Sequence, residues 1–168
     1  MNVLGYGLCA AKQYEDALPV RKAELSMMWR FDAPAASILA AQSNLANTYS
    51  MLGREEEALS LRRDAYSCRL KFEGEEHYDT ISAANSYASS LLKLERFEEA
   101  KALMRKTMPV ARRVLRDSND TTLRMRRVYA RTLYLDPGAT LDDLREAVTT
   151  LEDTEPVSYT HLTLPTKA

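Results

Sequence analysis

Apolar residues recur along the chain at helical spacing, with polar residues between them. One stripe consists of Ile38, Leu45, Tyr49 and Leu52, and the next consists of Ala58, Leu61, Ala65 and Cys68. Because this spacing places each stripe on one face of a helix, the two stripes predict two amphipathic helices. Gly53 lies between them and suits the left-handed end of the first helix, since glycine has no Cβ to clash.

The same pattern predicts helices along nearly the whole chain. The expected ranges are 2–11, 14–30, 35–52, 55–72, 78–94, 97–116, 121–135 and 140–153. Segments rich in Asp, Gly, Asn and Pro separate these ranges, and residues 1–153 contain no competing strand pattern. Trp29 is the sole tryptophan, and we expect it to pack in the core or between repeats. The sequence therefore predicts an all-α fold.

The helical pattern repeats with a period of 42 residues. Ala46, Ala88 and Ala130 are spaced by this period, and a partial earlier copy places Ala17 41 residues before Ala58. One amphipathic hairpin cannot bury its apolar face alone, whereas stacked hairpins share a continuous core. We therefore expect an α-α superhelix, or solenoid, of stacked antiparallel helical hairpins. The small alanines at the repeated positions are expected where two helices approach closely.

The repeats define the expected domain organisation. We expect one repeat domain over residues 1–154, with copies near 1–31 (partial), 35–72, 78–116 and 121–154. The first copy begins in mid-motif and the last has no polar cap, so we expect cut ends that fray or self-associate. Residues 155–168 are rich in threonine and leave the helical period, and we expect this tail to be disordered or a linker artefact.

The repeated motif resembles a known family. The segments Leu45–Tyr49, Leu52–Arg54 and Glu56–Ala58 together are similar to the tetratricopeptide repeat, which is usually about 34 residues long. The longer 42-residue form resembles the kinesin light chain type. The connector Phe72–Thr80 is also similar to that of the kinesin light chain type, although Tyr78 stands where the family has proline. The resemblance implies a scaffold that binds other proteins.

In this family the first helix of each pair lines a concave groove, so the resemblance carries the groove positions onto this chain by register. The candidate peptide-binding residues are Ser43, Asn47, Ser50, Ser82, Asn85, Ser89, Arg124, Arg127 and Arg131. The serines are small enough to let a peptide backbone approach. Asn47 and Asn85 offer both a donor and an acceptor, which suits the amides of an extended peptide.

The three arginines indicate the chemistry of the ligand. Arg124, Arg127 and Arg131 are spaced i, i+3 and i+7, so they share one stripe of a helix. Guanidinium groups bind carboxylates through paired hydrogen bonds, which favours an acidic peptide or a C-terminal carboxylate as the ligand. The alternative is that the arginines and asparagines are ordinary solvated surface residues.

Composition and charge narrow the function classes. The net charge is −1, which gives no general attraction to nucleic acid, and no segment has the roughly 20 apolar residues of a membrane span. The two cysteines form no disulfide framework, and no secretory leader is visible, so we expect a cytoplasmic protein. His77 and His161 have no partners at metal or catalytic spacing, and no phosphate-binding loop occurs. We therefore expect no enzyme activity, cofactor or metal.

Three hypotheses remain open for the function. The first is a scaffold that binds a protein or peptide partner in the groove. The second is a regulatory repeat segment of a larger enzyme or NTPase whose catalytic domain lies outside this chain. The third is a structural spacer without a ligand, which a change of the arginine stripe to alanine would distinguish from the first.

Overall fold

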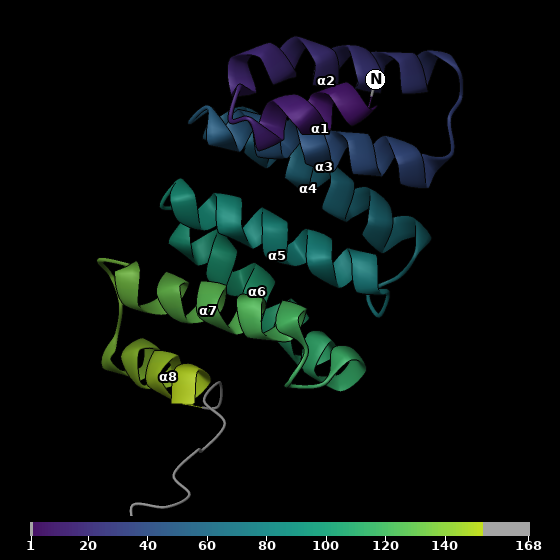
Figure 1. Cartoon of the computed structure of the whole chain (residues 1–168). Helices are drawn as coiled ribbons and strands as arrows, with labels where there is room; N and C mark the ends of the chain where they lie inside the picture. The colour runs from purple at the N-terminus through teal and green to yellow at the C-terminus, as the bar shows by residue number, and fades with distance from the viewer. Residues whose placement is uncertain (1, 153–168) are drawn as a thin grey trace, which may run out of the picture.

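The computed structural model describes residues 2–152, which form helices packed in consecutive pairs (Figure 1). The helices are α1 (Asn2–Ala10), α2 (Tyr14–Arg30), α3 (Ala35–Met51), α4 (Glu55–Phe72), α5 (Tyr78–Lys93), α6 (Phe97–Leu115), α7 (Asp120–Leu135) and α8 (Leu141–Glu152). The predicted ranges agree with these bounds to within one residue at each end. The expectation for the tail at 155–168 concerns residues outside the described part of the chain.

The first three hairpins turn through the same backbone geometry. Gly53 has the left-handed φ of 72° expected from the sequence, and Lys12 and Glu95 occupy the corresponding positions with φ of 59° and 57°. After Gly53, the Arg54 backbone N–H donates to the Tyr49 carbonyl over 2.9 Å. The same six-residue bond closes the other two hairpins, and it satisfies a carbonyl that the helix end leaves free. The turn therefore recurs even where a residue other than glycine must adopt the left-handed backbone conformation.

Successive helices pack against each other along the chain, and α5 also contacts α7 directly. In Figure 1 the first helices of the hairpins, α3, α5 and α7, lie one below another, with α4 and α6 behind them. This arrangement is the stacked helical solenoid that the 42-residue period predicts. It places every forty-second residue at an equivalent position in the next layer.

Small residues lie at the helix crossings. Ala46 on α3 and Ala58 on α4 are fully buried, as are Ala88 on α5 and Ala100 on α6. The core around Ala46 and Ala58 includes Leu18 of the preceding hairpin, so each layer is sealed by its neighbour. Alanine at these crossings lets the helix backbones approach, as expected from the sequence.

Trp29 departs from the sequence-based expectation, because 59% of its surface is exposed. It lies in the last turn of α2 and lines an apolar cleft of about 460 Å³. Ile38 and Leu39 of α3 and Phe72 of α4 also line this cleft, so the indole ring lies at its edge beside the next hairpin. A core position for Trp29 is therefore wrong, whereas its place beside α3 and α4 lies between the first two copies.

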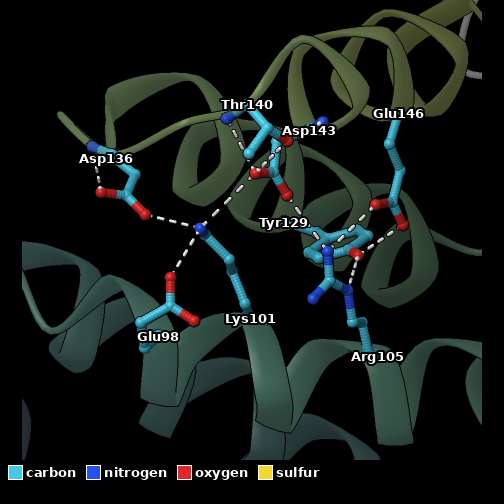
Figure 2. Close-up of polar contacts among 9 residues, drawn as sticks. Glu98, Lys101, Arg105, Tyr129, Asp136, Thr140, Asp143 and Glu146 are labelled. Atoms are coloured by element: carbon cyan, nitrogen blue, oxygen red, sulfur yellow. Dashed lines mark hydrogen bonds and ion pairs between the residues drawn. The ribbon is translucent and has the colours of Figure 1, made fainter.

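Beside the apolar core that joins α6, α7 and α8, one position of the last layer carries a buried charge. Lys101 on α6 stands where the two earlier layers have Leu18 and Leu59, and it is only 4% exposed. Its Nζ lies 2.5 Å from Asp136 Oδ2 and 2.8 Å from Glu98 Oε1 (Figure 2). Burial disfavours the charged ammonium, but these hydrogen bonds outweigh it and raise the pKa of Lys101.

The turn between α7 and α8 and the start of α8 supply two carboxylates that face Lys101. Asp136 lies in that turn, and its hydrogen bond from Lys101 lowers the pKa of its carboxyl. Asp143 caps α8: its Oδ2 accepts from the Thr140 backbone N–H over 3.0 Å, and its own N–H donates to Thr140 Oγ1 over 3.1 Å. These bonds from Thr140 lower the pKa of Asp143.

Arg105 is a second cation on α6 that contacts both α7 and α8. The Arg105 guanidinium donates to Tyr129 Oη over 3.1 Å and to Asp143 Oδ1 over 3.1 Å (Figure 2). The Tyr129 hydroxyl donates in turn to Glu146 Oε1 over 2.5 Å. Burial and this carboxylate raise the pKa of Tyr129 to about 12. The charged groups around Lys101 and Arg105 thus bind one another, which indicates that they hold α8 in place.

Candidate peptide-binding face

A polar cleft of about 150 Å³ opens between α3 and α5, and α4 forms its floor. Its lining consists of Ser43, Asn47, Arg62, Ala65, Arg69, Asp79, Ser82, Ala83 and Ser86. Three of the residues predicted from the sequence, Ser43, Asn47 and Ser82, are thereby brought together in one cleft. We call this the α3/α5 cleft.

The floor of the α3/α5 cleft is Arg62. Its Nη1 donates to Ser90 Oγ over 2.5 Å, and its Nη2 donates to Asn47 Oδ1 over 2.9 Å. Both acceptors are neutral, and no carboxylate of residues 2–152 lies within ion-pair distance of this guanidinium. Burial lowers the pKa of Arg62, although the charge of Glu55 partly opposes the effect.

At the other end of the α3/α5 cleft, the charged side chains form ion pairs with one another. Arg69 Nη1 lies 3.0 Å from Glu73 Oε1 and 3.0 Å from Asp79 Oδ2. His77 caps α5 by accepting the Asp79 backbone N–H at Nδ1. Glu73, His77 and Asp79 place ligand atoms within 4.8 Å of one another, but the Arg69 guanidinium already binds both carboxylates. This cluster therefore braces the connector between α4 and α5.

The serine hydroxyls of the cleft point their protons into the protein. Ser43 Oγ donates to the Leu39 carbonyl over 2.9 Å, and Ser86 Oγ donates to the Ser82 carbonyl over 3.1 Å. Each hydroxyl oxygen retains lone pairs that can accept a hydrogen bond. The serines thus offer acceptors, while Arg62 offers donors.

Ser50 does not join this cleft. Its hydroxyl donates to Glu55 Oε1 over 2.8 Å, and Lys93 Nζ lies 2.5 Å from the same hydroxyl oxygen. Lys93 Nζ also lies 2.7 Å from Glu55 Oε1. Ser50 is therefore part of a cross-link between α3, α4 and α5, at one end of the face.

The two remaining positions on α5 are half-buried. Asn85 Oδ1 is buried and has no hydrogen-bond partner within residues 2–152. Ser89 Oγ donates to the Asn85 backbone carbonyl over 2.8 Å. Neither residue lines the α3/α5 cleft.

The arginine stripe lies along α7, where the sequence places it. Arg124 Nη2 forms an ion pair with Asp120 over 2.5 Å. Arg127 and Arg131 form no hydrogen bond or ion pair within residues 2–152. By the 42-residue register, Arg127 and Arg131 occupy on α7 the positions that Ser43 and Asn47 occupy on α3.

Sequence reasoning missed Arg62. A signal was present, because Arg62 falls within the buried stripe of α4, between Ala58 and Ala65. The next layer has Met104 at the corresponding position, fully buried. A charge in a stripe that is otherwise apolar indicates either an internal partner or an external one.

None of the helices formed by residues 2–152 is long and apolar enough to cross a membrane.

Comparison with known proteins supports the fold. Residues 37–113 match the family model described as tetratricopeptide repeat. A comparison with curated proteins gave no match. Among solved structures, the kinesin light chain TPR-like repeats of Podosopora anserina are similar at 22% identity and a TM-score of 0.73, covering 90% of this chain and 70% of that one. A single-substitution variant of those repeats gives 22% identity and a TM-score of 0.75, with coverage of 90% and 69%.

A more distant structure, BtubC (BKLC) from P. vanneervenii, is similar at 14% identity with a TM-score of 0.63. It covers 91% of this chain and 68% of that one. These likenesses show a shared fold of stacked helical repeats.

Proposed function

We propose that this chain, whose residues 37–113 are tetratricopeptide repeats, is a non-catalytic scaffold that holds an extended acidic peptide of a partner protein across α3, α5 and α7. The observation that carries the proposal is the pair Arg127 and Arg131, which has no anionic partner within residues 2–152. The pair stands in register with Ser43 and Asn47 of the α3/α5 cleft. A ligand that crosses the layers meets both groups of residues.

The chemistry of α7 favours carboxylates. Each guanidinium presents five N–H donors in a fixed fork, which matches two carboxylate oxygens. Two guanidinium groups four residues apart lie one helical turn apart, so acidic side chains on an extended peptide can reach both. Exposed charges interact through screened water, so we expect binding that weakens with salt.

The chemistry of the α3/α5 cleft suits a peptide backbone. The hydroxyl oxygens of Ser43 and Ser86 can accept N–H groups, because their protons are held by helix carbonyls. The side chains there are small, so a main chain can approach the helices closely. Backbone hydrogen bonds supply affinity for an extended segment, and the arginines supply its acidic preference.

The test uses the 168-residue chain and an immobilised peptide array in which each glutamate-containing sequence has a glutamine twin. We expect selective retention of the glutamate peptides and loss of that selectivity in the triple variant Arg124→Ala, Arg127→Ala, Arg131→Ala. Loss of two or three charge-assisted contacts should weaken binding at least about tenfold. Raising the salt concentration from about 0.1 M to about 1 M, where the Debye length falls to about 3 Å, should abolish the preference.

A charge-matched control separates the groove from general basicity. Arg63, Arg113 and Arg145 are exposed arginines on α4, α6 and α8, the second helices of their hairpins. Changing all three to alanine removes the same net charge and should leave the glutamate preference intact. Equal loss in both triple variants, or no loss in the α7 variant, would refute the proposal.

A further inference from the structure

One position on the second helices of the first three hairpins is occupied by arginine twice and by methionine once. Arg21 on α2 corresponds to Arg62 on α4 and to Met104 on α6. The residue three positions later is Glu24 on α2, but Ala65 on α4. This internal comparison shows what each layer places in the same space.

The first layer neutralises its arginine internally. Arg21 Nη1 lies 2.9 Å from Glu24 Oε2, and these side chains are 2% and 5% exposed. The guanidinium also lies 4.6 Å from the centre of the Tyr6 ring and packs against Gly5, where a Cβ would come within 2.9 Å of it. The glutamate carboxylate and α1 together close this layer.

The third layer closes the same space with hydrocarbon. Met104 is fully buried and belongs to the apolar core that includes Met125 of α7. Here α5 and α7 are in direct contact. No charge needs a partner at this position.

The middle layer has the arginine but lacks the acid. Ala65 stands where Glu24 supplies a carboxylate, and it lines the α3/α5 cleft beside Arg62. Arg62 uses two of its N–H donors on the neutral oxygens of Ser90 and Asn47, and a guanidinium has about five. The amide nitrogen of Asn47 makes no hydrogen bond within residues 2–152, so it is a further donor at the same place.

We propose that the α3/α5 cleft is a subsite for one carboxylate side chain, an aspartate or glutamate of the bound partner, held by Arg62 and Asn47. The proposal rests on the proposed function, because it assigns one acidic residue of the peptide to one place. The inserted carboxylate takes the role that Glu24 plays toward Arg21. A partner thereby completes an ion pair that the preceding layer completes by itself.

The charges around the cleft agree with a single negative group. Of the lining residues, Arg62 and Arg69 are cationic and Asp79 is anionic, and Arg69 already binds Asp79. Arg69 also binds Glu73, which adjoins the lining, whereas Arg62 forms no ion pair within residues 2–152. A cleft of about 150 Å³ has room for a short side chain, and one carboxylate balances the charge of Arg62.

The direct test is an NMR titration of the full chain with N-acetylglutamate N-methylamide, following the Arg62 Nε–Hε resonance. The glutamine analogue is the matched neutral probe, N-acetylglycine represents a C-terminal carboxylate, and methyl phosphate represents a phosphate. We expect a saturable shift with the glutamate probe and at least about tenfold weaker binding of the glutamine probe. Binding of methyl phosphate or N-acetylglycine in preference to the glutamate probe would overturn the side-chain assignment, as would the absence of a shift.

Two variants and one control complete the test. Ala65→Glu recreates the pair of the preceding layer and should weaken binding of the glutamate probe at least about tenfold. Arg62→Met copies the third layer and should do the same, whereas Arg63→Met on the exposed side of α4 should not. Circular dichroism establishes that each variant is folded, and the titration of the unaltered chain stands without them. Retained binding in folded Ala65→Glu would contradict the inference.

The outcome is distinguishable from failure of the proposed function. If the peptide array depends on the α7 arginines but is indifferent to Arg62→Met, the scaffold proposal stands and the subsite is wrong. If the glutamate probe binds at Arg62 while the array shows no glutamate preference, the cleft binds a carboxylate but the acidic-peptide scaffold is wrong.

Discussion

The recurring left-handed turn allows a reciprocal experiment at Gly53 and Glu95. Both residues occupy the same place in their hairpins, with φ of 72° and 57°, and both are followed by the same closing hydrogen bond of 2.9 Å. A Cβ added at Gly53 would meet no atom within 4 Å. The Glu95 side chain makes no hydrogen bond or ion pair within residues 2–152. The exchange therefore isolates backbone conformation from side-chain contacts.

The magnitude follows from the conformation alone. A left-handed conformation costs an L-residue about 1–2 kcal/mol, and glycine gives back about 0.4–1 kcal/mol through the larger entropy of its unfolded chain. We therefore expect Glu95→Gly to raise the free energy of unfolding by about 0.5–1 kcal/mol. Gly53→Glu should lower it by a similar amount, and the double exchange should be close to neutral.

Urea denaturation followed by circular dichroism of the helical signal measures these differences through the midpoint concentration. In a chain of this size, a change of about 1 kcal/mol corresponds to about 2–4 °C in the thermal midpoint. Glu95→Gln is the matched control, since it removes the charge and keeps the Cβ, and it should leave the midpoint unchanged. If Glu95→Gly is destabilising, or if Glu95→Gln reproduces its effect, the turn is not strained and the reasoning fails.

Two further predictions concern packing and charge. Ala58→Leu and Ala100→Leu each add bulk at a fully buried helix crossing, so each should lower the free energy of unfolding by about 1–3 kcal/mol, and an unchanged thermal midpoint would contradict the assigned register. Lys101→Met should destabilise the chain at about pH 7 by removing the cation that Asp136 and Asp143 face. Because the pKa values of both carboxyls are lowered in the folded chain, their contribution is present above their ordinary range and is lost as the pH falls through the lowered values. The difference between Lys101→Met and the unaltered chain should therefore shrink below about pH 4, and a difference independent of pH would exclude the ion pairs as its cause.

The helices and their stacking could be predicted because they depend on local patterns. Ala46, Ala88 and Ala130 set the period, and the apolar stripe around each alanine defines which face is buried. Gly53 identified the turn, although Glu95 shows that the same turn forms without glycine when the closing hydrogen bond and the packing demand it. Periodicity therefore predicted the bounds even at the turn that lacks glycine.

The site could be predicted only in part, because it depends on what neighbouring layers place beside each residue. Ser43, Asn47 and Ser82 share the α3/α5 cleft as a consequence of register, which the sequence contains. Ser50 contacts Glu55 and Lys93 instead, and that three-helix cross-link has no signal in the spacing of one helix.

The surroundings of Arg62 and Trp29 could not be predicted from the pattern along a single helix. Arg62 lies in an apolar stripe, yet its surroundings depend on the space between α3 and α5. Trp29 lies in a helix, yet its ring is exposed at the edge of a cleft that α3 and α4 line. A pattern along one helix indicates which face it turns inward, but not whether a neighbour fills the space there.

The succession of Arg21, Arg62 and Met104 has a consequence for how a partner aligns. A solenoid with identical layers offers an extended chain several equivalent frames, each shifted by one hairpin. Among these three layers, one is closed by its own glutamate and another by methionine, so the middle one alone is left to accept an acid. The α3/α5 cleft would therefore set which residue of the partner lies on which hairpin. A partner segment shifted by one hairpin would leave its acidic residue without a counter-charge.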